Sequence, residues 1–178
     1  MTLSEILLAI VLSLPAPWYK AGKAPETPSA YQSRLETIAK AIAMEAEAAE
    51  DWRWDASSLA AATLVVWYGE SRFALEVHNG SGKSRYGEDD GRARCFGQIH
   101  QTGLVPRDEW KSLTGIDLEA TRRCARATMR VLSVQGRRCG MQVDKPSMWA
   151  VARMVSAYGS GATWRPTCSA ISDASMMP

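Results

Sequence analysis

The sequence predicts an all-α or mostly α fold in a single domain, and three observations support this. A chain of 178 residues suits one domain with a sizeable core. Apolar residues recur at helical spacing over 30–50, and a second, largely apolar stretch follows Asp55, while no strand pattern of comparable length appears. With 46% apolar and 22% charged residues, the composition is that of a globular protein rather than a disordered chain.

The first element is an apolar run, Glu5–Leu14, followed by Pro15 and Pro17. Two interpretations of this run stay open. It could be a degenerate signal peptide, although the acidic Glu5 stands where such a peptide carries basic residues. It could equally be a short helix that packs on the domain and ends at the prolines. The run is too short to cross a bilayer, so no stable membrane span is expected.

We assign residues 1–28 to this apolar segment and to a linker rich in Pro, Gly and Lys, and residues 29–178 to the folded domain. The domain is expected to begin with a helix over about 30–50. Apolar residues from Leu35 onward recur on one face of this helix, and polar residues such as Arg34 lie on the other face. This pattern predicts an amphipathic helix against the core.

A second helix should begin at Asp55, because aspartate is a favourable N-cap residue. Small and apolar residues follow, among them Leu59, Ala62 and Val66. A helix that is apolar on most of its surface is usually buried. The sequence therefore predicts a central, buried helix that ends at Glu70.

The segment 78–94 is polar, contains four glycines and shows no core periodicity, so it should form a long surface loop. Long loops in compact domains are usually functional or disordered. A third helix is expected after Asp117, with Glu119 in its first turn and Gly136 past its end. A fourth helix is expected over about 147–158.

The chain contains four cysteines, Cys95, Cys124, Cys139 and Cys168. None of them forms a CxxC pair, and the two histidines, His78 and His100, lack the spacing of metal ligands. We therefore expect no metal and no cofactor. An even number of scattered cysteines favours two disulfides and an oxidising, extracytoplasmic destination, with four free thiols as the alternative.

Helix geometry limits how these cysteines can pair. On a continuous helix, Cys124 and Cys139 would lie roughly 22 Å apart at 1.5 Å per residue. A disulfide needs Cα atoms within about 7 Å, so this pairing is disfavoured. We prefer Cys95–Cys124 together with Cys139–Cys168, and the alternative is Cys95–Cys139 together with Cys124–Cys168.

The net charge and the aromatic content of the chain indicate which kinds of molecule it could bind. The net charge of +2 does not predict a nucleic-acid partner, for which a basic stripe would be expected. It is compatible with an anionic polymer such as a bacterial wall. The chain has seven Trp against two Phe. Each Trp suits a protein core, but indole rings also stack on sugar faces.

A glutamate at a helix end is usually a solvated surface charge, but Glu70 differs in two respects. It follows a very apolar run, which predicts partial desolvation. It also lies near a helix C-terminus, where the macrodipole disfavours negative charge. Both effects raise the pKa of a carboxyl group. A carboxyl that keeps its proton near neutral pH can act as a general acid on a glycosidic oxygen.

Three segments follow one another along the chain: Glu-Ser-Arg-Phe at 70–73, Cys-Phe-Gly-Gln-Ile-His at 95–100 and Ser-Ala-Tyr-Gly-Ser-Gly at 156–161. Together they resemble the lytic transglycosylase and goose-type lysozyme family. Its members carry Glu-Ser at a helix end, then a Gly-Leu-Met-Gln-Ile-like segment, then Ala-Tyr-Asn-x-Gly. The resemblance covers about residues 55–165 and implies a lysozyme-like domain whose central buried helix ends at the catalytic glutamate.

The resemblance implies roles for four residues. Glu70 matches the catalytic acid/base, and Ser71 matches a residue that helps to orient the substrate and the acid. Gln98 matches the glutamine that lines the cleft, and Tyr158 matches the tyrosine whose hydroxyl points toward the catalytic carboxyl. From the residues alone, Ser71 could be a plain helix-end hydroxyl, Gln98 a solvated loop amide and Tyr158 a half-buried helix-end tyrosine.

The chain departs from the family pattern at two places. Cys-Phe-Gly at 95–97 replaces Gly-Leu-Met, and Gly159 replaces the asparagine after the tyrosine. Inverting glycosidases also need a second carboxylate that activates water. The candidates are Glu88, Asp89 and Asp90, for which a solvated acidic run is the simpler interpretation. Lytic transglycosylases work with one carboxyl group.

The resemblance implies an enzyme that cleaves the β-1,4 bond between N-acetylmuramic acid and N-acetylglucosamine in a peptidoglycan glycan strand, by the one-carboxyl route of a lytic transglycosylase. A hydrolytic lysozyme or a chitinase-like hydrolase on the same scaffold is the alternative enzyme. A non-catalytic wall-binding or virion structural protein is a third reading. The expected location is periplasmic, secreted or virion-associated, and a phage, injection or secretion assembly stays open as its setting.

Overall fold

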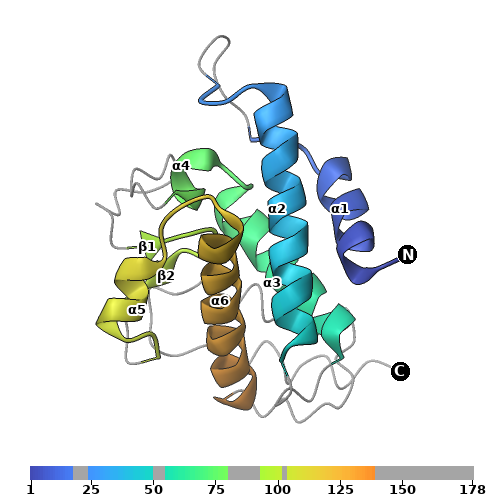
Figure 1. Ribbon diagram of the computed structural model, residues 1–178. Coiled ribbons are helices and arrows are strands. Elements are labelled where there is room, and N and C mark those ends of the chain that lie inside the picture. Colours follow the sequence, from blue (N-terminus) through green and yellow to red (C-terminus); the bar gives the residue numbers. More distant parts are fainter. Residues whose placement is uncertain (18–23, 50–54, 80–92, 102–103, 139–178) are drawn as a thin grey trace, which may run out of the picture.

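A computed structural model of the protein describes residues 1–17, 24–49, 55–79, 93–101 and 104–138 (Figure 1). These residues are mostly helical, as the sequence predicts. The elements in chain order are α1 (Leu3–Ser13), α2 (Pro28–Glu47), α3 (Ala56–Ser71), α4 (Leu75–His78), β1 (Ala93–Arg94), β2 (Ile99–His100), α5 (Arg107–Ser112) and α6 (Leu118–Arg138). The expected fourth helix, 147–158, lies outside the described residues.

The N-terminal apolar run forms a helix, α1, that is packed on the domain. Thr2 and Glu5 form a capping box, in which the Glu5 N–H donates to Thr2 Oγ1 at 3.2 Å and the Thr2 N–H donates to Glu5 Oε2 at 2.7 Å. Leu7 and Val11 are buried in the same hydrophobic core as residues of α2 and α3. Residues 1–14 therefore contribute apolar side chains to the domain core.

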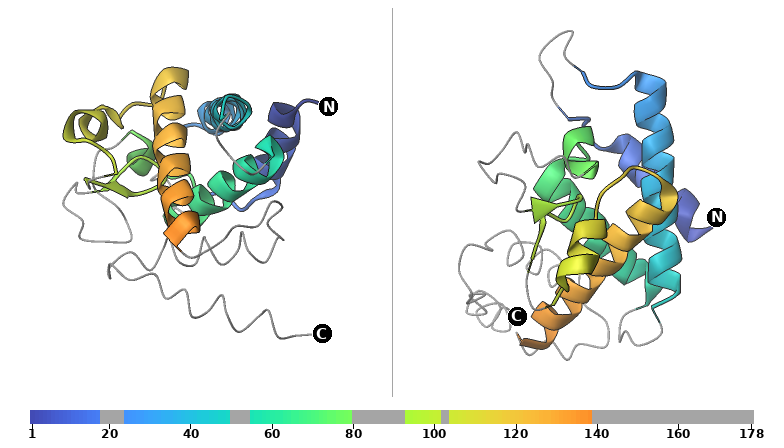
Figure 2. Two further views of the ribbon diagram at one scale, coloured as in Figure 1. Left: turned by 90° about the horizontal axis from the view of Figure 1, so that it is seen from below. Right: turned by 60° about the vertical axis from the view of Figure 1, so that its left-hand side comes forward.

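Helix α2 runs through the middle of the structure, with α1 on one side and α6 on the other (Figures 1 and 2). Thr27 caps its N-terminus by accepting the Ala30 N–H at 3.2 Å, and Pro28 takes the first helical position. The expected apolar face is buried from Leu35 to Ala46. The expectation that Arg34 lies on the exposed face is wrong, because this side chain is buried and paired with Glu26.

Helix α3 begins as the sequence predicts, with the Asp55 carboxylate accepting the Ser58 N–H at 2.9 Å. Half of its residues are buried, including Ala60, Ala62 and Trp67. Small side chains on this helix let it pack close to α2 and α6. The Trp67 indole N–H donates to Thr128 Oγ1 of α6 at 2.9 Å, so this large side chain is buried with its polar atom satisfied.

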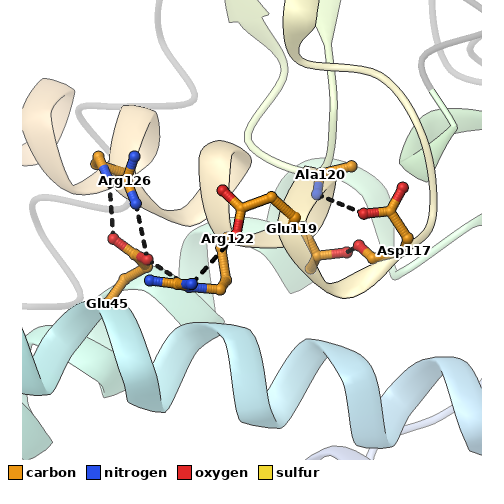
Figure 3. A network of polar contacts seen from close by, with 7 residues as sticks. Glu45, Asp117, Glu119, Ala120, Arg122 and Arg126 are labelled. Carbon is orange, nitrogen blue, oxygen red and sulfur yellow. Dashed lines mark hydrogen bonds and ion pairs between the residues drawn. The ribbon is translucent and has the colours of Figure 1, made fainter.

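A buried carboxylate joins α2 to α6 (Figure 3). Arg122 Nε donates to Glu45 Oε1 at 2.7 Å, and Arg126 Nε donates to Glu45 Oε2 at 2.9 Å. Arg122 also forms an ion pair with Glu119. The Glu45 side chain is 5% exposed, so loss of its partners would leave a buried charge uncompensated. This network therefore fixes the position of α2 along α6.

Helix α6 begins where the sequence predicts, because the Asp117 carboxylate accepts the Ala120 N–H at 2.9 Å and Glu119 lies in the first turn (Figure 3). The predicted end is wrong, since the helix continues through Gly136 to Arg138. One glycine inside a helix costs only about 1 kcal/mol relative to alanine, and a long helix tolerates this. Glycine alone therefore did not mark the end.

The ends of the expected loop 78–94 also differ from the prediction. His78 ends the short helix α4 and is buried, and Arg94 belongs to strand β1. Strands β1 and β2 form an antiparallel hairpin with Ala93 opposite His100. Residues 80–92 lie outside the described part of the chain. Elements of two to six residues are too short to show a hydrophobic period, which explains why β1, β2, α4 and α5 were not predicted.

Candidate functional site

Glu70 lies in the last turn of α3, and its side chain is half-buried. Burial raises the pKa of its carboxyl group above the ordinary value, and the nearby His100 partly offsets this by lowering the pKa. The carboxyl end of the helix disfavours the ionised form further. Within the described residues, the Glu70 carboxyl makes no hydrogen bond or ion pair. Burial is therefore the main influence on the pKa of this carboxyl group.

The two residues after Ser71 end α3 in an unusual way. Arg72 and Phe73 have φ angles of 48° and 57°, in the left-handed region that favours glycine. The Arg72 N–H still donates to the Tyr68 carbonyl at 2.9 Å, which closes the last turn. Phe73 then turns its ring into the core, where it is 1% exposed. This turn sets where the helix stops, and Glu70 lies directly before it.

Ser71 is buried, and its hydroxyl is engaged at the helix end. It donates to the Trp67 carbonyl at 2.6 Å and accepts the Phe73 N–H at 3.2 Å. Ser71 therefore fixes the turn that follows Glu70. The structure places this side chain in the interior, where both hydrogen bonds of its hydroxyl are to backbone groups at the helix end.

Gln98 closes the turn of the hairpin that faces the end of α3. Its N–H donates to the Cys95 carbonyl at 3.0 Å, and both residues have positive φ angles, 48° for Gln98 and 53° for Cys95. The Gln98 side chain is half-buried. Gln98 directly precedes β2, two residues before His100, whose charge acts on Glu70.

A disulfide between Cys95 and Cys124 ties this turn to α6, and this half of the preferred pairing is confirmed. Both cysteines are buried. The bridge spans 29 residues. A loop of this length is expected to stabilise the fold by about 3.5 kcal/mol through the entropy of the unfolded chain. Cys139 and Cys168, the other expected pair, lie outside the described residues.

A cluster of aromatic side chains packs the hairpin against α3. The Phe96 ring lies 5.0 Å from Trp67, 5.7 Å from Phe73 and 4.0 Å from His78, measured between ring centroids. Phe96 and Trp67 are fully buried. The Phe96 ring thus lies between the hairpin and the end of α3. The hairpin is therefore packed against the end of the helix that carries Glu70.

Helix α5 supports the outer side of the hairpin. The Trp110 indole N–H donates to the Ile99 carbonyl at 2.8 Å. The Arg94 guanidinium lies 4.2 Å from the centroid of the Trp110 ring, within the range of a cation–π interaction. These contacts join both strands to α5, so the hairpin is braced from two sides.

His100 is a site residue that the sequence analysis missed. It is exposed at the end of β2, and its positive charge acts on Glu70 when it is protonated. Side chains alternate along a strand, so buried Ile99 leaves its strand neighbour His100 on the opposite, outward side. The alternation in Ile-His could have revealed this residue, but a two-residue strand gave too little pattern.

The structure brings Glu70, Ser71 and the hairpin that carries Gln98 into one region. Tyr158 lies outside the described residues, as do the acidic candidates Glu88, Asp89 and Asp90. In the described part of the chain, no group of three metal-ligating side chains is found. The same residues contain no helix long and apolar enough to cross a membrane.

Comparisons with known proteins provide no further guide. No protein-family model, no curated protein and no solved structure matches this chain. Among the described residues of the candidate site, the half-buried carboxyl of Glu70 at the end of α3 is the group with a raised carboxyl pKa.

Proposed function

We propose that the protein is a peptidoglycan-degrading glycosidase of lysozyme-like fold that acts as a lytic transglycosylase on the β-1,4 bond between N-acetylmuramic acid and N-acetylglucosamine. The observation that carries this proposal is the half-buried Glu70 carboxyl at the end of the apolar helix α3, whose pKa is raised by burial. Glu70 would be the catalytic acid/base. The sequence resemblance at 70–73, 95–100 and 156–161 supplies the substrate class.

One carboxyl group accounts for both halves of the proposed reaction. Protonated Glu70 gives its proton to the glycosidic oxygen, and the bond from that oxygen to C1 of the muramoyl residue breaks. The Glu70 carboxylate then takes the proton of the muramoyl 6-hydroxyl, whose oxygen bonds to C1. The products are a 1,6-anhydromuramoyl end and a free 4-hydroxyl, and Glu70 is protonated again.

The surroundings of Glu70 suit this cycle. A raised pKa favours the protonated acid in the first step and makes the carboxylate a better base in the second. Gln98, on the hairpin beside the end of α3, would donate or accept a hydrogen bond with sugar or peptide. The disulfide between Cys95 and Cys124 supports an oxidising, extracytoplasmic destination, either secreted, periplasmic or within a virion or injection device.

The test is digestion of purified peptidoglycan by the parent protein and by Glu70→Gln, with the products identified by mass spectrometry. The parent should release 1,6-anhydro ends, and Glu70→Gln should lose about 100-fold or more of the rate. Glu36→Gln, which removes an exposed carboxylate of α2, is the matched control and should retain the parent rate.

Four other outcomes would redirect the assignment. Reducing ends in place of anhydro ends would identify a hydrolytic lysozyme, and cleavage of chitin instead of peptidoglycan would identify a chitinase-like hydrolase. Equal activity of Glu70→Gln and the parent would remove Glu70 from the reaction. Wall binding without cleavage by the parent would indicate a non-catalytic wall-binding protein.

A further inference from the structure

A buried polar cluster lies behind the end of α3, and Arg34 is at its centre. This arginine projects from α2, and its side chain is 4% exposed. It forms an ion pair with Glu26, and its Nε donates to Glu26 Oε2 at 3.0 Å. Its Nη2 also donates to the carbonyl of Phe73 at 2.9 Å. A single side chain of α2 is therefore bonded to the turn that follows Glu70.

His78 completes the cluster from the other side. Thr121 Oγ1 donates to the Asp117 carbonyl at 2.7 Å, so at 2.8 Å it accepts the N–H of His78 Nε2. His78 Nδ1 is then left as an acceptor and faces Arg34 Nη1 at 3.4 Å. The Arg34 guanidinium also lies 5.9 Å from the centroid of Phe96, at the tip of the hairpin. Arg34 thus contacts both segments that flank Glu70.

The turn at Arg72 and Phe73 needs such support. Non-glycine residues in the left-handed region cost energy, so two in succession persist only where their surroundings hold them. Here Ser71 holds the N–H of Phe73, Arg34 holds its carbonyl, and the core holds its ring. Both ends of the Phe73 backbone are therefore fixed by buried side chains. Strained backbone of this kind often accompanies functional sites.

We propose that Arg34 is a positioning residue for Glu70, acting through its hydrogen bond to the Phe73 carbonyl. By fixing the turn that ends α3, Arg34 holds the last turn of this helix in place. It thereby determines how deeply the Glu70 carboxyl is buried. The planar guanidinium suits this role because it can bond Glu26, Phe73 and His78 at once in a fixed fork. The kinetic part of the inference rests on the proposed function; the structural part does not.

The primary readout is the titration of the Glu70 carboxyl followed by carbon-13 NMR, assigned by its loss in Glu70→Gln. In Arg34→Gln the turn should relax and Glu70 should become more solvated, so its pKa should fall toward the ordinary value. On soluble peptidoglycan fragments kcat should fall by about tenfold or more while KM changes little, as expected for a misplaced catalytic group. Both measurements use the full chain.

The matched control is Glu45→Gln. Glu45 is also a buried, ion-paired residue of α2, but its partners are Arg122 and Arg126 on α6. This variant should lose stability without changing the pKa of Glu70 or kcat. If Arg34→Gln and Glu45→Gln, each at a temperature where it is folded, alter the Glu70 titration equally, the positioning role is refuted.

A second variant covers the case in which Arg34→Gln does not fold because Glu26 is left buried and unpaired. The double variant Glu26→Gln/Arg34→Met removes both charges together, which cores tolerate better than the loss of one partner. It should show the same fall in the Glu70 pKa, and a parent-like titration in this folded variant would overturn the inference. The titration also separates the two proposals, since it decides on Arg34 even if the parent does not cleave peptidoglycan.

Discussion

Two opposing influences act on the proton of Glu70. Burial raises the pKa of this carboxyl, and His100 lowers it when the imidazole carries a positive charge. A positive charge at this position favours the ionised carboxylate and so opposes the effect of burial. A neutral side chain at position 100 would leave burial unopposed.

We therefore predict that His100→Gln raises the pKa of Glu70. Carbon-13 NMR titration of the Glu70 carboxyl measures this directly. The alkaline limb of the activity profile should move to higher pH in parallel, because the acid stays protonated further. Arg107→Gln removes an exposed positive charge on α5 that has no such influence on Glu70, and it should leave the titration unchanged. A lower Glu70 pKa in His100→Gln would contradict the prediction.

Arg72 is an exposed residue whose backbone conformation favours glycine. Its guanidinium lies 5.6 Å from the Tyr68 ring centroid, so its side chain also contributes a weak contact. Both Arg72→Gly and Arg72→Ala lack that contact, so the difference in stability between the two variants reports only on the backbone conformation. Arg72→Gly should be more stable by about 1 kcal/mol in urea denaturation, since alanine retains the Cβ clash. Equal stabilities would show that the turn is not strained here.

At the scale of elements, α1 offers a sharp contrast between its two faces. Leu7 is 2% exposed in the shared core, whereas Leu12 on the same helix is 49% exposed. Leu7→Ala should destabilise the whole domain by about 2–5 kcal/mol, because it opens a cavity in the core. Leu12→Ala should change the free energy of unfolding by less than about 0.5 kcal/mol. Similar small effects for both would mean that α1 unfolds independently of the domain.

At the scale of the whole molecule, His78 couples stability to pH. Burial lowers its pKa well below the usual value of about 6.5, and the nearby Arg34 lowers it further. On acidification, the unfolded chain therefore binds a proton at His78 that the folded protein does not bind. Stability should be full above pH 6.5 and should fall as the pH drops below it, with a slope of up to about 1.4 kcal/mol per pH unit.

Chemical denaturation at a series of pH values measures this slope, and His78→Gln should flatten it. Glu70 acts in the opposite direction. Its raised pKa means that the folded protein binds this proton more tightly, so Glu70 adds stability as the pH falls toward the ordinary carboxyl value of about 4.3. A steeper fall on acidification is thus expected in Glu70→Gln. For His78, an unchanged slope in His78→Gln would show that this residue is not the source of the pH-dependent stability.

The long elements could be predicted from the sequence because their determinants are local. Asp55 and Asp117 cap helices with their own carboxylates, and the apolar face of α2 recurs from Leu35 to Ala46. Helix geometry disfavoured Cys124–Cys139 but left two pairings open, of which the preferred one contains the observed pair Cys95–Cys124. The short elements could not be predicted, since their stability comes from contacts made in the folded chain.

The candidate site shows the same division. Glu70 could be identified because burial and the helix end are both encoded beside it in the chain. Arg34 could not be identified, because its partner carbonyl is 39 residues away and helix periodicity alone placed it in solvent. The influence of His100 on the pKa of Glu70 likewise arises only because the hairpin packs against α3 in the folded chain. Interactions between distant segments thus account for the parts of the site that were missed.

The disulfide between Cys95 and Cys124 has a topological consequence. It closes a covalent ring that contains β2, α5 and the beginning of α6. A protease that cuts one peptide bond inside this ring cannot separate the part carrying Glu70 from α6, because the two fragments remain linked through sulfur. The nicked protein would run as a single species on a denaturing gel until a reductant is added.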